Sequence, residues 1–69
     1  MIRVGSRVKW NWGNGEAKGK VSKIYNEDIE LDINGTSVKR KASTSKPAYL
    51  IVQDDNEEVL KSSSEVSKC

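Results

Sequence analysis

Residues 8–15 carry the strongest structural signal in this chain and have the sequence Val8-Lys9-Trp10-Asn11-Trp12-Gly13-Asn14-Gly15. Apolar side chains alternate with polar ones, which is the period-two pattern of a half-buried β-strand. The Gly-Asn-Gly run then predicts a hairpin connection that ends the strand. Because Trp10 and Trp12 are two residues apart, their side chains lie on the same face of a regular strand. The sequence therefore predicts a strand over residues 7–12 with an aromatic pair on one face.

A second strand is expected over residues 17–27, directly after this turn. Val21 and Ile24 are three residues apart instead of two or four, which predicts a bulge or a sharp bend in that strand. Gly19 lies inside the strand, where a missing side chain allows the close approach of Trp10 or marks a bend. In segment 29–33 the hydrophobic residues alternate with acidic ones, which predicts a third strand. Asn34-Gly35 follows directly and is a strong signal for a hairpin, whose returning strand is expected to include Val38 and its neighbours.

The second half of the chain continues in the same way. Residues 48–52 form a continuous apolar run that is too short for an ordinary helix and predicts a central strand. An acidic turn follows at residues 54–56, and a closing strand is expected at 58–61. Serines at the start of segment 62–66 predict a single capped helical turn. The chain is therefore expected to be all-β, a small curled barrel of five or six strands that forms one domain over residues 1–66, with a short disordered tail at 67–69.

Composition excludes most kinds of active site. The 69 residues include no histidine and one cysteine, so catalytic triads, mixed Cys/His zinc sites and an intrachain disulfide are all excluded. Glu30 and Asp32 fall on a solvated strand face, and the acidic turn lacks the glycine and alternating ligands of a calcium loop. We expect no catalytic residue, no cofactor and no metal site, and we interpret Cys69 as an exposed thiol.

The sequence also bears on location and partners. No apolar run approaches the ~18 residues that a membrane helix needs, and the first ten residues lack the apolar stretch of a signal peptide. We therefore expect a cytoplasmic protein without a membrane partner. We also expect it to be a monomer.

Charge is distributed in blocks behind a net charge of +2. Residues 2–23 carry a net +5, 24–34 a net −4, 39–46 a net +4 and 53–58 a net −4. Basic side chains mixed with hydroxyls suit contacts with phosphate groups, so the basic segments 18–23 and 39–46 indicate nucleic acid, DNA or RNA, as one partner. The candidate phosphate contacts are Lys18, Lys20, Lys39, Arg40 and Lys41.

Five separated segments resemble one known family. They are Val8 to Gly15, Gly19-Lys20-Val21, Val38 to Ser43, Pro47-Ala48-Tyr49, and Asp54-Asp55 with Val59-Leu60-Lys61. In their order and spacing these segments are similar to the hypervirulence-associated protein Tudor domain family, from about Val4 to Val66. The resemblance implies a Tudor/SH3-like barrel and no established enzymatic activity. Asn56 departs from the family pattern, because a glycine is common at its place in the acidic turn.

The resemblance directs attention to the aromatic residues, because Tudor-type modules hold methylated lysine or arginine in a cage of aromatic rings. The candidates for an aromatic binding face are Trp12, Tyr25, Tyr49 and Trp10, with Asn11, Asp54 or Asp55 as the polar partner. A chain without phenylalanine also needs large rings in its core, so at least two of the four are expected to be structural. Trp12 is expected to be exposed, followed by Tyr49 or Tyr25. We expect a non-catalytic module that binds a protein or peptide; the alternatives are nucleic-acid binding and a purely structural domain.

Overall fold

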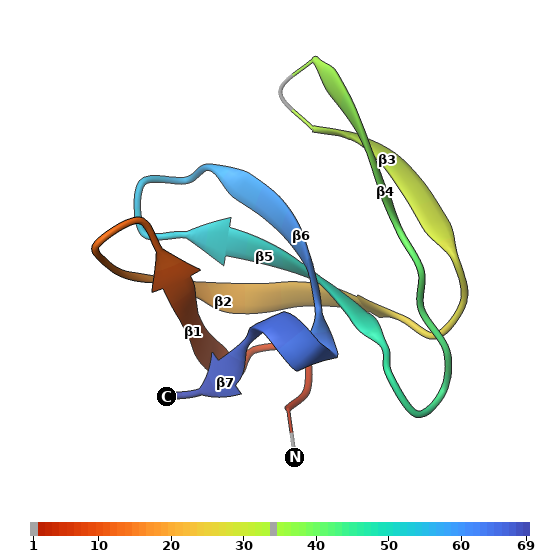
Figure 1. Ribbon diagram of the computed structural model, residues 1–69, viewed down its shortest axis with the longest axis horizontal. Coiled ribbons are helices and arrows are strands. Elements are labelled where there is room, and N and C mark those ends of the chain that lie inside the picture. Colours follow the sequence, from red (N-terminus) through yellow and green to blue (C-terminus); the bar gives the residue numbers. More distant parts are fainter. Residues whose placement is uncertain (1, 34) are drawn as a thin grey trace.

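The computed structural model describes residues 2–33 and 35–69 and consists of β-strands joined by short turns (Figure 1). In chain order the elements are β1 (Arg7–Trp12), β2 (Gly15–Tyr25), β3 (Ile29–Ile33), β4 (Thr36–Arg40), β5 (Ala48–Gln53), β6 (Glu58–Ser62), the 3-10 turn η1 (Ser63–Glu65) and β7 (Ser67–Lys68). Five strands form one antiparallel sheet in the order β6-β5-β2-β1-β7, and β3 pairs with β4 in a separate hairpin. The predicted all-β class is confirmed.

The β1–β2 hairpin sets the register of the first two strands. Trp12 pairs with Gly15, so Gly13 and Asn14 form a two-residue loop. Gly13 has a φ of +57°, a conformation that glycine adopts without the steric cost that a side chain would bring. From this turn the pairing runs without interruption to Arg7, which lies opposite Lys20. As a result, the buried residues of β1 lie opposite small residues of β2, and the basic residues that lie opposite one another share the other face.

The bulge predicted from the spacing of Val21 and Ile24 is confirmed. The register between β2 and β5 shifts between Val21 and Lys23, so Ser22 is an extra residue on β2. The backbone of Val21 also bonds the N-terminal segment: its carbonyl accepts from the Gly5 amide at 2.8 Å, and its amide donates to the Ser6 carbonyl at 2.9 Å. The bulge bends β2 at the point where the N-terminal segment crosses it.

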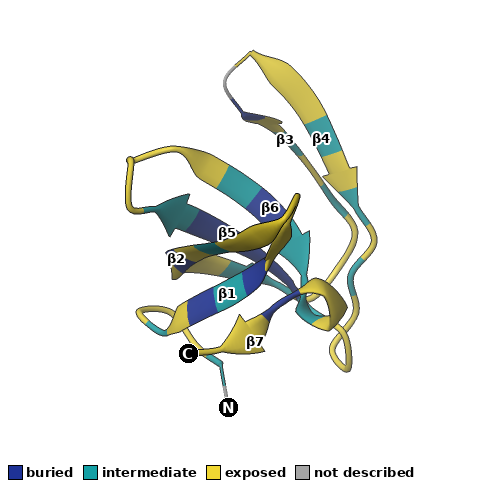
Figure 2. Ribbon diagram, turned by 60° about the vertical axis from the view of Figure 1, so that its left-hand side comes forward, coloured by how far each residue is buried: buried dark blue, intermediate teal, exposed yellow. Residues whose placement is uncertain are grey.

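The core lies on both faces of the five-stranded sheet. Figure 2 shows buried segments in β1, β5 and β6. One face carries a cluster that includes Val8, Trp10 and Ile51, and the other carries a cluster that includes Leu50 and Leu60. Strand β5 lies between β2 and β6, and its residues 48–51 are all buried. This arrangement explains why the sequence of β5 is continuously apolar and does not alternate.

The β3–β4 hairpin covers part of the second face. Ile33 is buried with Leu50 and Leu60, and the half-buried Ile29, Leu31 and Val38 pack against the same cluster. The strands pair from Ile29 opposite Arg40 to Ile33 opposite Thr36, which confirms the predicted hairpin. Of its predicted turn, Gly35 has a φ of +81°, and Asn34 lies outside the described residues. Figure 1 shows β3 and β4 as a separate two-stranded ribbon beside the five-stranded sheet.

Both chain segments that follow the last long strand are ordered. The predicted capped turn is η1, in which the side chain of Ser62 accepts from the Ser64 amide and that of Glu65 accepts from the Ser62 amide at 3.0 Å. Residues 67–69, for which we predicted a disordered tail, instead lie along β1: Ser67–Lys68 form β7, and the Cys69 amide donates to the Arg7 carbonyl at 3.0 Å. Val66 is buried in the core and holds these residues beside the edge of β1.

The acidic turn between β5 and β6 adopts the conformation that its residue types favour. Asp55 Oδ1 accepts from the Glu57 amide at 2.9 Å, and the Asn56 amide donates to the Gln53 carbonyl at 2.9 Å. Asn56 has a φ of +69°, in the left-handed region that asparagine tolerates better than most residues. The prediction of a turn is confirmed. The positive φ of Asn56 also explains why a glycine is common at this place in the family pattern, because glycine adopts positive φ without steric cost.

Gly19 allows a close approach, but the strand that approaches is β5. A Cβ atom built on Gly19 would lie 2.5 Å from Ile51 Cγ2 and 2.8 Å from the Val52 carbonyl oxygen. Trp10, the neighbour that we expected, is not among the three nearest atoms. The glycine thus allows the central strand to pack tightly on β2.

This close approach makes a testable prediction. Gly19→Ala should destabilise the protein by roughly 1–3 kcal/mol, because the new methyl group has to push apart two strands of the core. Gly15→Ala in the same strand is the matched control, since nothing lies within 4 Å of its Cβ position and its φ is not positive. The midpoint of urea unfolding measures both variants, and equal midpoints would contradict the prediction.

Candidate functional site

Trp10 and Trp12 line the same pocket at one end of the sheet. Trp10 is only 5% exposed, whereas Trp12 is 73% exposed. The pocket has a volume of about 260 Å³, and its lining is completed by Ala17, Gln53, Val59 and Lys61. The expectation that Trp12 is exposed agrees with the structure, and the two indoles share a face as their spacing predicts. We call this cavity the tryptophan pocket.

The curl of the sheet creates the tryptophan pocket. Strands β1 and β6 are separated by β2 and β5 in the sheet order, yet both contribute side chains to the pocket. Trp10 lies opposite Ala17 and Trp12 lies opposite Gly15, so β2 presents small residues below the indoles. These small residues leave space that the tryptophans do not fill. The pocket is therefore built by long-range strand pairing, and its lining residues include two tryptophans, a glutamine and a lysine.

Lys61 is held at the pocket by Glu65. The Lys61 ammonium lies 3.9 Å from Glu65 Oε2, and its side chain is 23% exposed. Glu65 Oε1 also lies 3.4 Å from Arg40 Nε on β4 and accepts the capping hydrogen bond from the Ser62 amide. One carboxylate thus connects η1, the β3–β4 hairpin and β6. It fixes the position of the positive charge in the pocket wall.

The other predicted aromatic residues lie elsewhere. Tyr49 is 5% exposed and packs in the same core cluster as Trp10, so it contributes to the core. Tyr25 is half-buried and packs against the cluster on the opposite face of the sheet. The four rings therefore do not form one cage among the residues that the structure describes. Two of them, Trp10 and Trp12, remain as the aromatic part of a candidate site.

The predicted polar partners also lie outside the tryptophan pocket. Asn11 is exposed and lies opposite Glu16, on the face of β1 that points away from the two indoles. Asp54 and Asp55 line a neighbouring pocket of about 260 Å³ together with Ala17, Lys18 and Gln53. Ala17 and Gln53 line both pockets, so the acidic turn lies next to the tryptophan pocket without contributing a carboxylate to it.

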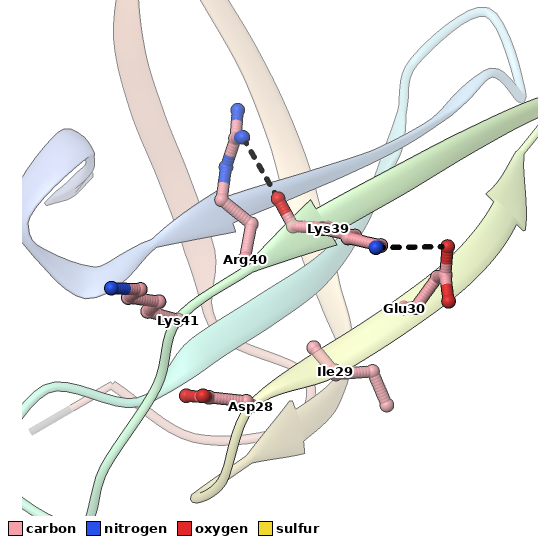
Figure 3. A pocket seen from close by; sticks show the side chains of 6 residues that line it. All are labelled: Asp28, Ile29, Glu30, Lys39, Arg40 and Lys41. Carbon is pink, nitrogen blue, oxygen red and sulfur yellow. Dashed lines mark hydrogen bonds and ion pairs between the residues drawn. The ribbon is translucent and has the colours of Figure 1, made fainter.

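A larger pocket, of about 470 Å³, lies at the base of the β3–β4 hairpin (Figure 3). Its acidic and basic side chains come from facing strands and are partly paired: Lys39 Nζ lies 3.8 Å from Glu30 Oε2. Arg40 Nη1 donates to the Lys39 carbonyl at 3.2 Å. The pocket is lined by Asp28, Ile29, Glu30, Lys39, Arg40 and Lys41. Within this lining Lys39 pairs with Glu30, whereas Arg40 pairs with Glu65 outside it, so the pocket presents both signs of charge to a ligand.

The candidate phosphate contacts fall into two groups. Lys39, Arg40 and Lys41 lie at the end of the β3–β4 hairpin, beside Glu30 and Glu65. Lys18 and Lys20 are exposed on β2, opposite Lys9 and Arg7 of β1. The two groups belong to different sheets, so they do not form a single continuous ladder of basic residues.

Several residues of the tryptophan pocket were not predicted from the sequence. Gln53, Val59 and Lys61 are more than forty residues from Trp12 in the chain. Their approach depends on the pairing of β5 with β2 and β6 and on the curl of the sheet, which no local pattern encodes. For two of them the sequence did carry a signal: Val59 and Lys61 are two residues apart in a predicted strand, which places their side chains on the same face.

The described residues contain no group of three or more Cys, Asp and Glu side chains arranged to hold a metal ion. Within the same residues, no helix has the length and hydrophobicity needed to cross a membrane. Cys69 is exposed and is not part of a disulfide.

Comparison with known proteins identifies one similarity. A family model described as the Tudor domain of hypervirulence-associated proteins matches residues 5–66. No curated protein matches the chain, and no solved structure does. The matched region begins just before β1 and ends at the buried Val66, so it includes every residue of the tryptophan pocket.

The contacts of Glu65 lead to a second prediction. Glu65→Gln should retain the hydrogen bond to the Ser62 amide and lose the two ion pairs, at a cost below about 1 kcal/mol because all three side chains are partly exposed. Glu65→Ala should lose about 1 kcal/mol more, since the capping hydrogen bond is also removed. Chemical unfolding measures both variants, and a glutamine variant as unstable as the alanine variant would contradict the assignment of the cap.

Proposed function

Because the chain belongs to the hypervirulence-associated protein Tudor domain family, we propose that it is a non-catalytic binding module that recognises a protein or peptide partner at the tryptophan pocket. The exposure of Trp12 is the observation that carries this proposal. Its indole is 73% exposed at the rim of a pocket whose floor is formed by the buried Trp10. A partner that covers an exposed tryptophan gains about 2 kcal/mol from the apolar area removed from water.

The pocket lining supports one chemistry for the bound group. Indole rings, Val59 and Ala17 favour an apolar or aromatic side chain. Lys61 lines the pocket, and its partner Glu65 at 3.9 Å is shared with Arg40, so a carboxylate beside the bound side chain is favoured over a second cation. A methylated lysine would bring that second cation to a pocket in which none of the lining residues is acidic. We therefore propose a peptide in which an apolar or aromatic residue lies beside an acidic residue or a free C-terminus.

The hairpin segment offers weaker support for nucleic-acid binding than its sequence suggested. Lys39 lies 3.8 Å from Glu30 Oε2, and Arg40 lies 3.4 Å from Glu65 Oε1. These acidic partners reduce the positive charge that residues 39–46 present to a phosphate group. A purely structural domain, the remaining alternative, has no need for a tryptophan as exposed as Trp12.

Matched tryptophan variants test the proposal. Trp12→Ala should keep the fold, because the side chain is 73% exposed, and should abolish peptide binding. Trp10→Ala should unfold the protein, since removal of a buried tryptophan costs about 3–5 kcal/mol and a core of this size supplies little more. Circular dichroism measures the fold of each variant.

Binding is measured with a panel of otherwise identical peptides whose central pair is Phe-Glu, Leu-Glu, Phe-Gln or trimethyl-lysine-Glu. The amide and indole resonances of Trp10 and Trp12 report on contact with the pocket. We expect the two apolar–acidic peptides to shift these resonances most, and Lys61→Gln to remove the preference for Phe-Glu over Phe-Gln. The proposal fails if no peptide of the panel shifts them, and its choice of ligand fails if trimethyl-lysine binds best.

A further inference from the structure

The register of the β1–β2 hairpin places four basic side chains directly opposite one another. Arg7 pairs with Lys20, and Lys9 pairs with Lys18. Residues that lie directly opposite in an antiparallel pair share a face, with Cβ atoms about 4.5–5.5 Å apart. We call these four residues the basic quartet.

The quartet lies on the face of the sheet that points away from the tryptophan pocket. The alternating residues Val8, Gly19 and Val21 are buried on the other face. On the quartet's own face, the β3–β4 hairpin packs over Leu50 and Leu60, which belong to β5 and β6. The hairpin therefore covers the apolar half of this face, and the half formed by β1 and β2 is left exposed.

This concentration of like charge has a cost in the free protein. Like charges directly opposite one another in a sheet are destabilising, and two such pairs are adjacent here. Arg7 lies 3.2 Å from Asp54 and Lys9 lies 3.7 Å from Glu16, but all four side chains of these ion pairs are at least 41% exposed. Exposed ion pairs of this kind are weak and readily exchanged for other anions.

Lys18 and Lys20 are more available still. Among the residues that the structure describes, neither forms an ion pair. The nearby acidic groups come from three places. Glu16 lies two residues before Lys18 on the same face of β2, Asp54 and Asp55 share a pocket with Lys18, and Glu58 is separated from Lys20 by Val52 across the sheet. Two of them, Asp54 and Glu16, form ion pairs with Arg7 and Lys9, and in the described part of the chain none of them forms an ion pair with Lys18 or Lys20.

We propose that the basic quartet binds the phosphate backbone of double-stranded nucleic acid. Lysine and arginine side chains, together with amide and hydroxyl groups, make most backbone contacts in such complexes. Asn11 and Ser67 extend the quartet with these polar groups, because Asn11 follows Lys9 on the same face of β1 and Ser67 lies opposite Lys9. The resulting surface carries four basic side chains together with polar amide and hydroxyl groups.

Two other partners fit this face less well. Proteins that bind single strands stack bases on aromatic rings, but Trp10 and Trp12 point to the opposite face and Tyr25 packs with the cluster beneath the hairpin. An acidic peptide needs an apolar anchor at the centre of its interface, and the quartet surrounds none. Regularly spaced phosphates on a stiff duplex require neither stacking nor an anchor.

Fluorescence anisotropy with a labelled 16-base-pair DNA duplex tests the proposal. Four phosphate contacts predict a dissociation constant on the order of 10⁻⁵ M at about 50 mM salt and a slope of log K against log salt of roughly −3 to −4. The double variant Lys18→Gln/Lys20→Gln should weaken binding roughly 100-fold at this salt concentration and change the slope to about −2. Its unfolding midpoint should be no lower than that of the unaltered protein, because the variant relieves repulsion.

The double variant Lys39→Gln/Lys41→Gln is the matched control. It removes two positive charges, as the first double variant does, but from the hairpin region. If the quartet makes the phosphate contacts, this control should weaken duplex binding less than about threefold. Trp12→Ala should bind the duplex normally, which separates this surface from the peptide site.

Four results would overturn the proposal. They are the absence of duplex binding at 50 mM salt, equal losses in the two lysine double variants, tighter binding of the corresponding single strand, and tighter binding of a 16-residue aspartate peptide. Each result would assign the quartet to another partner or to no partner.

Discussion

The burial of β5 on both of its faces is the constraint on which the rest of the structure depends. Residues 48–51 are buried in succession, so the sheet needs an apolar cover on each side. Residues 2–33 and 35–69 include no α-helix that could provide it, and Cys69, the one cysteine of the sequence, forms no disulfide. One cover is obtained by curling the sheet, which brings β1 and β6 to the same pocket, and the other by packing the β3–β4 hairpin on Leu50 and Leu60.

The tryptophan pocket and the basic quartet both lie where the curled sheet and the β3–β4 hairpin leave part of the five-stranded sheet uncovered. The curled sheet encloses Trp10 and Tyr49 but leaves Trp12 at its rim, where small residues of β2 lie opposite the indoles. The hairpin covers β5 and β6 but leaves the outer face of β1 and β2 exposed. An exposed indole and an unbalanced group of cations are both unfavourable in isolation, and each is relieved by a partner of complementary chemistry.

Local patterns in the sequence predicted most of the fold. Alternation identified β1, β3 and the bulge in β2, the continuous apolar run identified β5, and serine capping identified η1. The pairing of β7 with β1 was not predicted. This two-residue strand is held in place because the preceding Val66 is buried in the core, and a local sequence pattern does not show that burial. The site was predicted only in part: Trp12 was recognised as exposed, whereas Gln53 and Lys61 reach the pocket through strand pairing over long sequence separations. The positions of Lys9 and Arg7 next to Lys18 and Lys20 were not predicted either, because they depend on the register in which β1 pairs with β2.

The register of β1 against β2 determines the composition of both surfaces. Along β1, Trp10 and Trp12 occupy one face and Arg7 and Lys9 the other, so a slip of one residue would exchange indoles for cations on each side of the sheet. Two glycines oppose such a slip when β2 is the strand that moves. Gly13 has the positive φ that its two-residue loop uses, and Gly19 is the position in β2 where β5 approaches too closely for a side chain. A slipped β2 would place a larger side chain against Ile51, so the packing that stabilises the core also keeps the aromatic and basic surfaces on opposite faces.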